Sequence, residues 1–97
     1  MGKSYIRAEN EKILKENITI HWWNFGKKTL DFKGTVKEYL NKNKVEIQIK
    51  YYQDEEHNFE RNIITAKFIC GQFQEIKFKC HSLEDTVRMI INFNLAY

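Results

Sequence analysis

Two groups of residues in this chain are of types that could do chemistry: the neighbours Cys80 and His81, and the carboxylates around residues 54–57. A cysteine beside a histidine can act as a nucleophile–base pair if the two side chains meet. Here the two residues lie at the end of an alternating run, Gln74–Cys80, and successive side chains of a strand point to opposite faces. We therefore expect Cys80 and His81 to diverge.

The acidic group consists of Asp54, Glu55 and Glu56, beside His57. Clustered carboxylates can bind a divalent cation or transfer protons, but the glycine and the ligand spacing of a calcium loop are missing here. We interpret the group as a solvated hairpin loop that offers a secondary contact to a basic partner.

Other motifs of catalysis and metal binding are missing from the sequence. The chain has no glycine-rich phosphate loop, no Gly-x-Ser-x-Gly turn and no His-Glu-x-x-His helix. Its two cysteines and three histidines lack the paired spacing of a zinc site. We therefore expect a protein that is not an enzyme, with no catalytic residues, no metal and no cofactor.

Three alternating runs, 44–52, 59–70 and 74–80, must position these groups, and each is typical of a strand with one buried and one wet face. A slip of one residue would turn apolar side chains outward, so the register is determined by the pattern. It predicts Phe68 opposite Ile76 and Ile64 opposite Cys80, across a loop of three or five residues. An even-length loop near residues 56–57 would pair Glu46 with Lys67.

This register separates the two cysteines. Cys70 and the partner position of Cys80 lie six residues apart, about 20 Å at ~3.3 Å per residue. A disulfide needs Cα atoms within about 7 Å. We therefore predict two buried, reduced thiols, as in a reducing compartment.

The remaining segments predict helices and two further strands. Ser4–Glu16 and Ser82–Asn92 have helical apolar spacing, whereas 18–25 and 29–33 resemble strands. Thr35–Asn43 fits either a short helix, favoured by the capping-box pattern of Thr35 and Glu38, or a bent strand. The sequence thus predicts one α+β domain over residues 1–97. It would have an antiparallel sheet of about five strands, including the meander 44–80, with the N- and C-terminal helices packed on one face.

The wet face of this meander is the best functional clue. Its basic residues are mostly lysines, and they would share the face with Tyr52. On the strand 18–25, Trp23 and Phe25 would lie opposite the core side, covered by a helix or available to a partner. The predicted partner-binding residues are Trp23, Phe25, Tyr52, Lys44, Lys50, Lys67, Lys77 and Lys79.

Composition limits the kinds of partner. The net charge is +3, but only three of the sixteen basic residues are arginines, which argues against sequence-specific reading of nucleic acid. No apolar run reaches the ~20 residues of a membrane span, and the N-terminal residues lack a signal peptide's apolar centre. We expect a cytoplasmic protein.

The sequence favours a binding module that acts through protein–protein contacts, such as a small inhibitor or accessory factor of the mobile-element type. The alternative is a nucleic-acid-binding module that uses the lysine-rich face and aromatic stacking on a single strand or RNA. An open sheet edge would also allow a homodimer.

Overall fold

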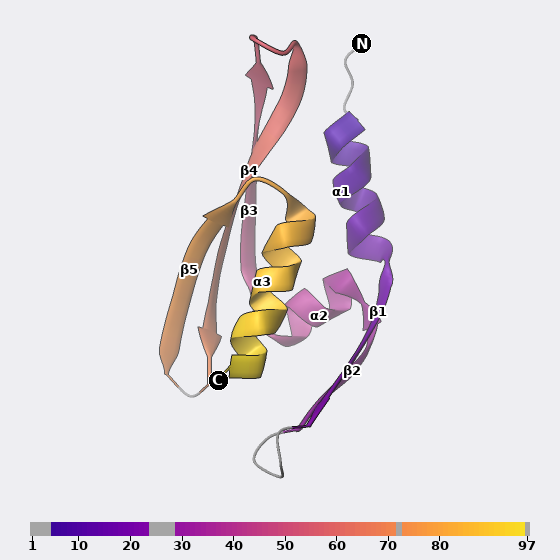
Figure 1. Ribbon diagram of the computed structural model, residues 1–97, viewed down its shortest axis with the longest axis vertical. Helices are drawn as coiled ribbons and strands as arrows, with labels where there is room; N and C mark the ends of the chain where they lie inside the picture. The colour runs from indigo at the N-terminus through magenta and orange to yellow at the C-terminus, as the bar shows by residue number, and fades with distance from the viewer. Residues whose placement is uncertain (1–4, 24–28, 72, 97) are drawn as a thin grey trace.

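The computed structural model describes residues 5–23, 29–71 and 73–96 and confirms the α+β class. Three helices accompany five strands, which divide into two antiparallel sheets, β1-β2 and β3-β4-β5, rather than forming a single sheet (Figure 1). The elements are α1 (Tyr5–Lys15), β1 (Asn17–Trp23), β2 (Thr29–Thr35), α2 (Val36–Lys42), β3 (Glu46–Asp54), β4 (Phe59–Cys70), β5 (Gln74–Cys80) and α3 (Leu83–Ala96).

The meander β3-β4-β5 has the register that the apolar pattern predicts. Phe68 pairs with Ile76 and Ile64 with Cys80, so three residues connect β4 to β5. Glu46 pairs with Lys67, and a loop of even length, residues 55–58, connects β3 to β4. Both hairpin predictions are confirmed, because a shifted register would have moved the apolar side chains out of the core.

The core lies between one face of the meander and the helices. The buried side chains of β4 are those at even positions, and α3 covers them with Leu83, Val87 and Ile90. α1 also packs on β4, where Asn10 Nδ2 donates to Asn62 Oδ1 at 2.8 Å. Asn62 in turn donates to the carbonyl of His81 at 2.8 Å. The N- and C-terminal helices therefore lie on one face, as predicted.

The division of the strands into two sheets follows from α2. A capping box starts this helix directly after β2: the Glu38 N–H donates to Thr35 Oγ1, and the Thr35 N–H donates to Glu38 Oε1. The helix then lies between the β1-β2 hairpin and the meander (Figure 1), so the two sheets do not join. Of the two interpretations of 35–43, the short helix is correct.

The described contacts of the β1-β2 hairpin with the body lie near its base. The Val36 N–H donates to the Glu16 carbonyl at 2.9 Å, and the Phe32 ring packs edge-on against Tyr39 with centroids 5.1 Å apart. Ile18 and Ile20 also pack against the core. Beyond these contacts the strands run away from the helices (Figure 1), and the molecule is elongated, 52 × 25 × 19 Å.

No disulfide joins the two cysteines, as predicted from the register. Cys70 is buried, but Cys80 is only half-buried, so the prediction of two buried thiols is wrong for Cys80. The reason is its place at the end of β5, an edge strand whose inner face is covered incompletely by α3. Among the described residues, no helix has both the length and the apolar character needed to cross a membrane.

Candidate binding surface

The outer face of the meander carries the predicted lysines. Lys50, Lys67, Lys77 and Lys79 occupy outward positions on the three strands and are exposed. Lys44 is also exposed and lies just before β3. The helices cover the opposite face, so the predicted geometry of an open, lysine-bearing side is present.

Few of these charges are neutralised. Lys67 lies 3.5 Å from Glu75, whereas Lys50, Lys77 and Lys79 form no ion pair within the described part of the chain. Lys67 and Lys77 are direct cross-strand partners. Like charges at opposed positions destabilise a sheet, so this pair costs stability that an anionic partner could recover.

One end of this face combines charge with apolar surface. A hollow of about 380 Å³ opens beside the β4–β5 turn. Ile69, which lines the hollow, is 56% exposed, and Phe73 in the adjacent turn is 88% exposed. The lining residues are Asn43, Lys44, Glu46, Lys67, Phe68, Ile69, Gly71 and Glu75. We call Lys44, Lys67, Ile69, Phe73 and Lys77 the turn-end patch.

Lys44 has an unusual backbone. Its φ of 53° is in the left-handed region, which glycine normally occupies after a helix. A left-handed residue with a side chain costs on the order of 1–2 kcal/mol. Such strain is found preferentially at functional sites, and here it occurs in a residue that lines the hollow.

The apolar members of this patch, Ile69 and Phe73, were not predicted from the sequence. The parity that places Phe68 and Cys70 inward also places Ile69 outward, so the alternation contained the signal for Ile69. Phe73 lies in a three-residue turn, where a large aromatic residue has no partner strand to pack on. An exposed phenylalanine in a turn was the second usable signal.

Tyr52 and the acidic loop lie at the other end of the meander. Tyr52 is half-buried opposite Arg61, so it is a poorer anchor than Phe73. Arg61 Nε lies 2.7 Å from Asp54 Oδ2, yet its N–H makes no aligned hydrogen bond, which leaves an ionic contact. The guanidinium also lies over the Phe59 ring, 4.9 Å from its centroid.

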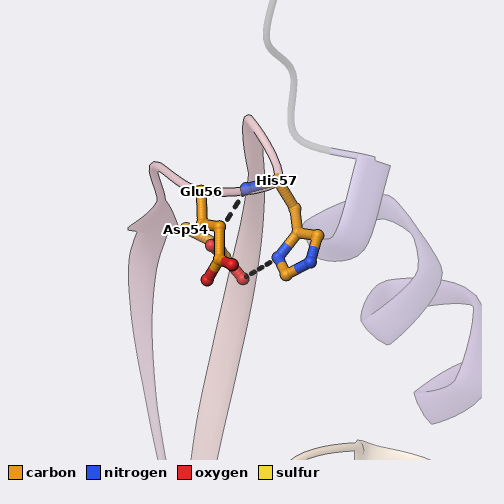
Figure 2. A group of neighbouring side chains, drawn as sticks. All are labelled: Asp54, Glu56 and His57. Carbon is orange, nitrogen blue, oxygen red and sulfur yellow. Dashed lines mark hydrogen bonds and ion pairs between the residues drawn. The ribbon is translucent and has the colours of Figure 1, made fainter.

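Asp54 is the structural centre of the acidic loop (Figure 2). The His57 ring Nδ1 lies 3.1 Å from Asp54 Oδ2, and the His57 backbone N–H donates to Asp54 Oδ1. The hydrogen bond from His57 lowers the pKa of Asp54, partial desolvation opposes this, and the charge of Arg61 adds to the lowering. The Asp54 side chain, 16% exposed, therefore stabilises its own loop, whereas Glu55 and Glu56 are exposed.

The same loop holds a group of metal-ligating atoms. Asp54, Glu56 and His57 offer one ligand atom each, within 4.8 Å of one another (Figure 2). Two of the three are exposed, and the Asp54 carboxylate already contacts Arg61. A cation would have to compete with that guanidinium, so these contacts describe a capped turn better than a metal centre.

Both tryptophans are exposed on the β1-β2 hairpin. Trp22 is 41% exposed and Trp23 is 59% exposed, so no helix covers Trp23 in the way that α3 covers the core of the meander. They lie in a different sheet from the lysines, so Trp23 and the lysine face do not form one surface. Phe25 lies outside the described residues.

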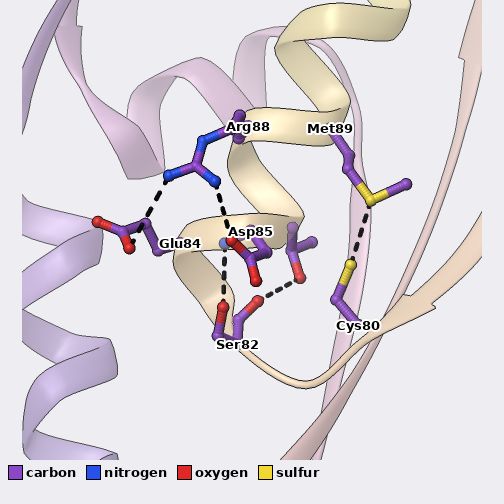
Figure 3. A network of polar contacts seen from close by, with 7 residues as sticks. Cys80, Ser82, Glu84, Asp85, Arg88 and Met89 are labelled. Atoms are coloured by element: carbon purple, nitrogen blue, oxygen red, sulfur yellow. Dashed lines mark hydrogen bonds and ion pairs between the residues drawn. The ribbon is translucent and has the colours of Figure 1, made fainter.

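Among the described residues, no hydrogen bond joins the Cys80 thiol to the His81 ring. The Cys80 thiol lies 3.4 Å from Met89 Sδ (Figure 3), whereas His81 accepts the hydrogen bond from Asn62 through its carbonyl. The neighbouring polar groups form a helix start: Ser82 Oγ accepts from the Asp85 N–H, and Arg88 bonds Asp85. These contacts are those of a capped helix N-terminus.

A second hollow, of about 360 Å³, lies between α1, β4 and the start of α3. Its floor includes Asn10 and Asn62, which already hydrogen-bond each other, and Leu83. Three glutamates, Glu9, Glu60 and Glu84, also line it. Glu60 pairs with Arg7 and Glu84 lies 4.0 Å from Arg88, so the rim is largely balanced in charge.

Comparison of the chain with protein-family models, with curated proteins and with solved structures found no match.

Proposed function

We propose that the protein is a binding module that contacts another protein through the turn-end patch. The observation that carries this proposal is the exposure of Ile69 and Phe73 beside a lysine-lined hollow. Protein interfaces combine buried apolar or aromatic anchors with a polar rim. The patch has this arrangement before any partner is bound.

The charges around the patch define the chemistry of the partner. Lys44 and Lys67 line the hollow together with Ile69, Lys77 is the cross-strand partner of Lys67, and Glu75 balances only part of their charge. The complementary surface is an apolar side chain flanked by carboxylates. Opposite charges of this kind accelerate association and select the partner. A small inhibitor or accessory factor would use such a surface.

The patch can be tested by affinity capture from a cell lysate followed by quantitative mass spectrometry. Phe73→Ser and Ile69→Ser should each lower the recovery of the same partner at least tenfold, as expected when an interface anchor costs about 1.4 kcal/mol or more. Tyr5→Ser is the matched control, because Tyr5 is 80% exposed and lies on α1. Equal recovery by all variants would refute the proposal.

A second candidate function is the binding of single-stranded nucleic acid on the same face. The opposed pair Lys67 and Lys77, with Lys79 at the next outward position of β5, would contact phosphates. Against it, Glu46 and Glu75 lie among these lysines and Tyr52 is half-buried. The exposed aromatic residue of the meander strands, Phe59, begins β4 beside the acidic loop, at the other end of the strand from Lys67.

Fluorescence anisotropy with labelled single-stranded DNA and RNA separates the two functions. Protein recognition predicts no binding at low salt. The nucleic-acid function instead predicts micromolar binding that is lost at moderate salt. Lys77→Glu should then abolish this binding, and Phe73→Ser should preserve it.

A further inference from the structure

In the described part of the chain, β1 is the one edge strand that carries neither a residue of the types Asp, Glu, Lys and Arg nor a proline. Exposed edge strands normally carry charges or proline, which prevent pairing with another chain. β3 has Glu46, Lys50 and Asp54, and β5 has two lysines and a glutamate. The sequence of β1, NITIHWW, contains no Asp, Glu, Lys, Arg or Pro over seven residues.

The other edge of the same hairpin is less accessible. β2 carries Asp31 and Lys33 and packs against α2. β1 pairs with β2 only, and its outward positions, including Thr19 and His21, are exposed. A two-stranded ribbon is marginally stable in water, whereas a sheet of three or more strands is stable. The hairpin therefore gains stability when a strand is added to β1.

We propose that this added strand is β1 of a second copy, paired antiparallel around Ile20. A two-fold axis perpendicular to the sheet keeps the same face of both copies on the same side. Ile20 then lies opposite Ile20 of the second copy, and Ile18 lies opposite its Trp22. Because Ile20 pairs with Phe32 and Trp22 pairs with Leu30, this face of the four-stranded sheet is apolar in both copies.

The other face opposes no like charges across the seam. Thr19 lies opposite His21 of the second copy, and their cross-strand partners are Lys33 and Asp31. Asp31 contacts the His21 ring of its own chain, so each row across the four strands has a lysine at one end and a His21–Asp31 pair at the other. The arrangement also places the exposed Trp22 of one hairpin against the base of the other, where its apolar surface would be covered.

Sedimentation velocity and light scattering test this pairing, which does not depend on the turn-end patch. The wild type should form a species of twice 11.8 kDa at micromolar concentrations. The variant Thr19→Lys/His21→Lys places like charges opposite each other in the dimer. It should dimerise about tenfold or more weakly. Thr19→Glu/His21→Glu should weaken the dimer in the same way.

Mixing the two variants provides the decisive control. A heterodimer of the lysine and the glutamate variant pairs opposite charges at every altered position, so the mixture should dimerise more tightly than either variant alone. Loss of folding in either variant would prevent this recovery. A monomeric wild type, variants that remain dimeric, or a mixture that stays monomeric would each overturn the proposal.

Discussion

Asn94 in α3 donates a hydrogen bond to the phenol oxygen of Tyr39 in α2, 2.7 Å away and 55 residues distant in the chain. Tyr39 is 2% exposed and Asn94 is also buried, so neither group can exchange this partner for water. The contact connects the helix that separates the two sheets to the helix that covers the meander. It is therefore a sensitive point for stability.

We predict that Tyr39→Phe lowers the free energy of unfolding by about 1–2 kcal/mol at neutral pH, because the buried Asn94 amide loses the nearer of its two acceptors, Tyr39 and Asn43. Urea unfolding measures this difference. Tyr5→Phe, which changes an exposed phenol, is the control and should have no effect at neutral pH. A loss no larger than that of the control would contradict the importance of this bond.

The stability of the wild type and that of Tyr39→Phe should depend differently on pH under alkaline conditions. Burial raises the pKa of Tyr39 above its ordinary value of 10.0, although the bond from Asn94 acts in the opposite direction. Above that ordinary value the unfolded chain loses the phenolic proton while the folded protein keeps it, so stability falls as pH rises. Tyr39→Phe removes this contribution, and the stability difference from wild type should narrow in strongly alkaline buffer. A constant difference would show that the raised pKa is wrong.

A second buried amide anchors α1. Asn62 is 1% exposed, accepts from Asn10 and donates to the His81 carbonyl. Asn62→Ala removes both bonds and leaves Asn10 Nδ2 with only its 3.2 Å bond to the Tyr51 hydroxyl, so it should cost about 2–3 kcal/mol. It should also speed hydrogen exchange in α1, as measured by NMR.

The matched comparison for Asn62 is Arg7→Gln. This variant removes an exposed ion pair with Glu60 and a cation–π contact with Tyr51. Exposed contacts of this kind contribute little to stability, because solvent screens them. If Arg7→Gln loosened α1 more than Asn62→Ala, the buried network would not be the anchor.

Lys44→Gly should stabilise the protein. Glycine relieves the left-handed conformation at φ 53°, and after its greater chain entropy is subtracted we expect a gain of about 0.5–1 kcal/mol. Lys50→Gly is the control, because Lys50 lies in an ordinary strand position, and it should instead lose about 0.5–1 kcal/mol. Thermal unfolding of both variants checks the opposite signs. A loss for Lys44→Gly would show that its side chain contributes more than the strain costs.

The acidic loop should respond to pH below the ordinary Asp value. Because the pKa of Asp54 is lowered in the folded protein, its stabilising effect is complete above 3.8 and is lost as pH falls through the lowered value. NMR titration of the carboxyl carbon should show this pKa, and His57→Ala should raise it. His81→Ala, which alters an exposed histidine outside the loop, should leave it unchanged. If His57→Ala left the pKa of Asp54 unchanged, the contact between the two side chains would be refuted.

Local pattern determined the secondary structure and much of the meander. Alternation with a period of two assigns a face to every residue, so the pairings of Phe68 with Ile76 and of Glu46 with Lys67 follow from the sequence. The capping box favoured α2 for the same local reason. The lysines of the outer face were predicted as a group because their parity is a local property as well.

Tertiary structure alone decided how these elements combine. The position of α2 between the hairpin and the meander depends on contacts between distant residues, such as Phe32 with Tyr39 and Tyr39 with Asn94. No periodicity contains that information. The packing of the elements placed Trp23 in a different sheet from the lysines, left β1 with an open edge and brought Lys44 to the side of Ile69. A pattern states which face a side chain occupies, whereas packing decides what that face meets.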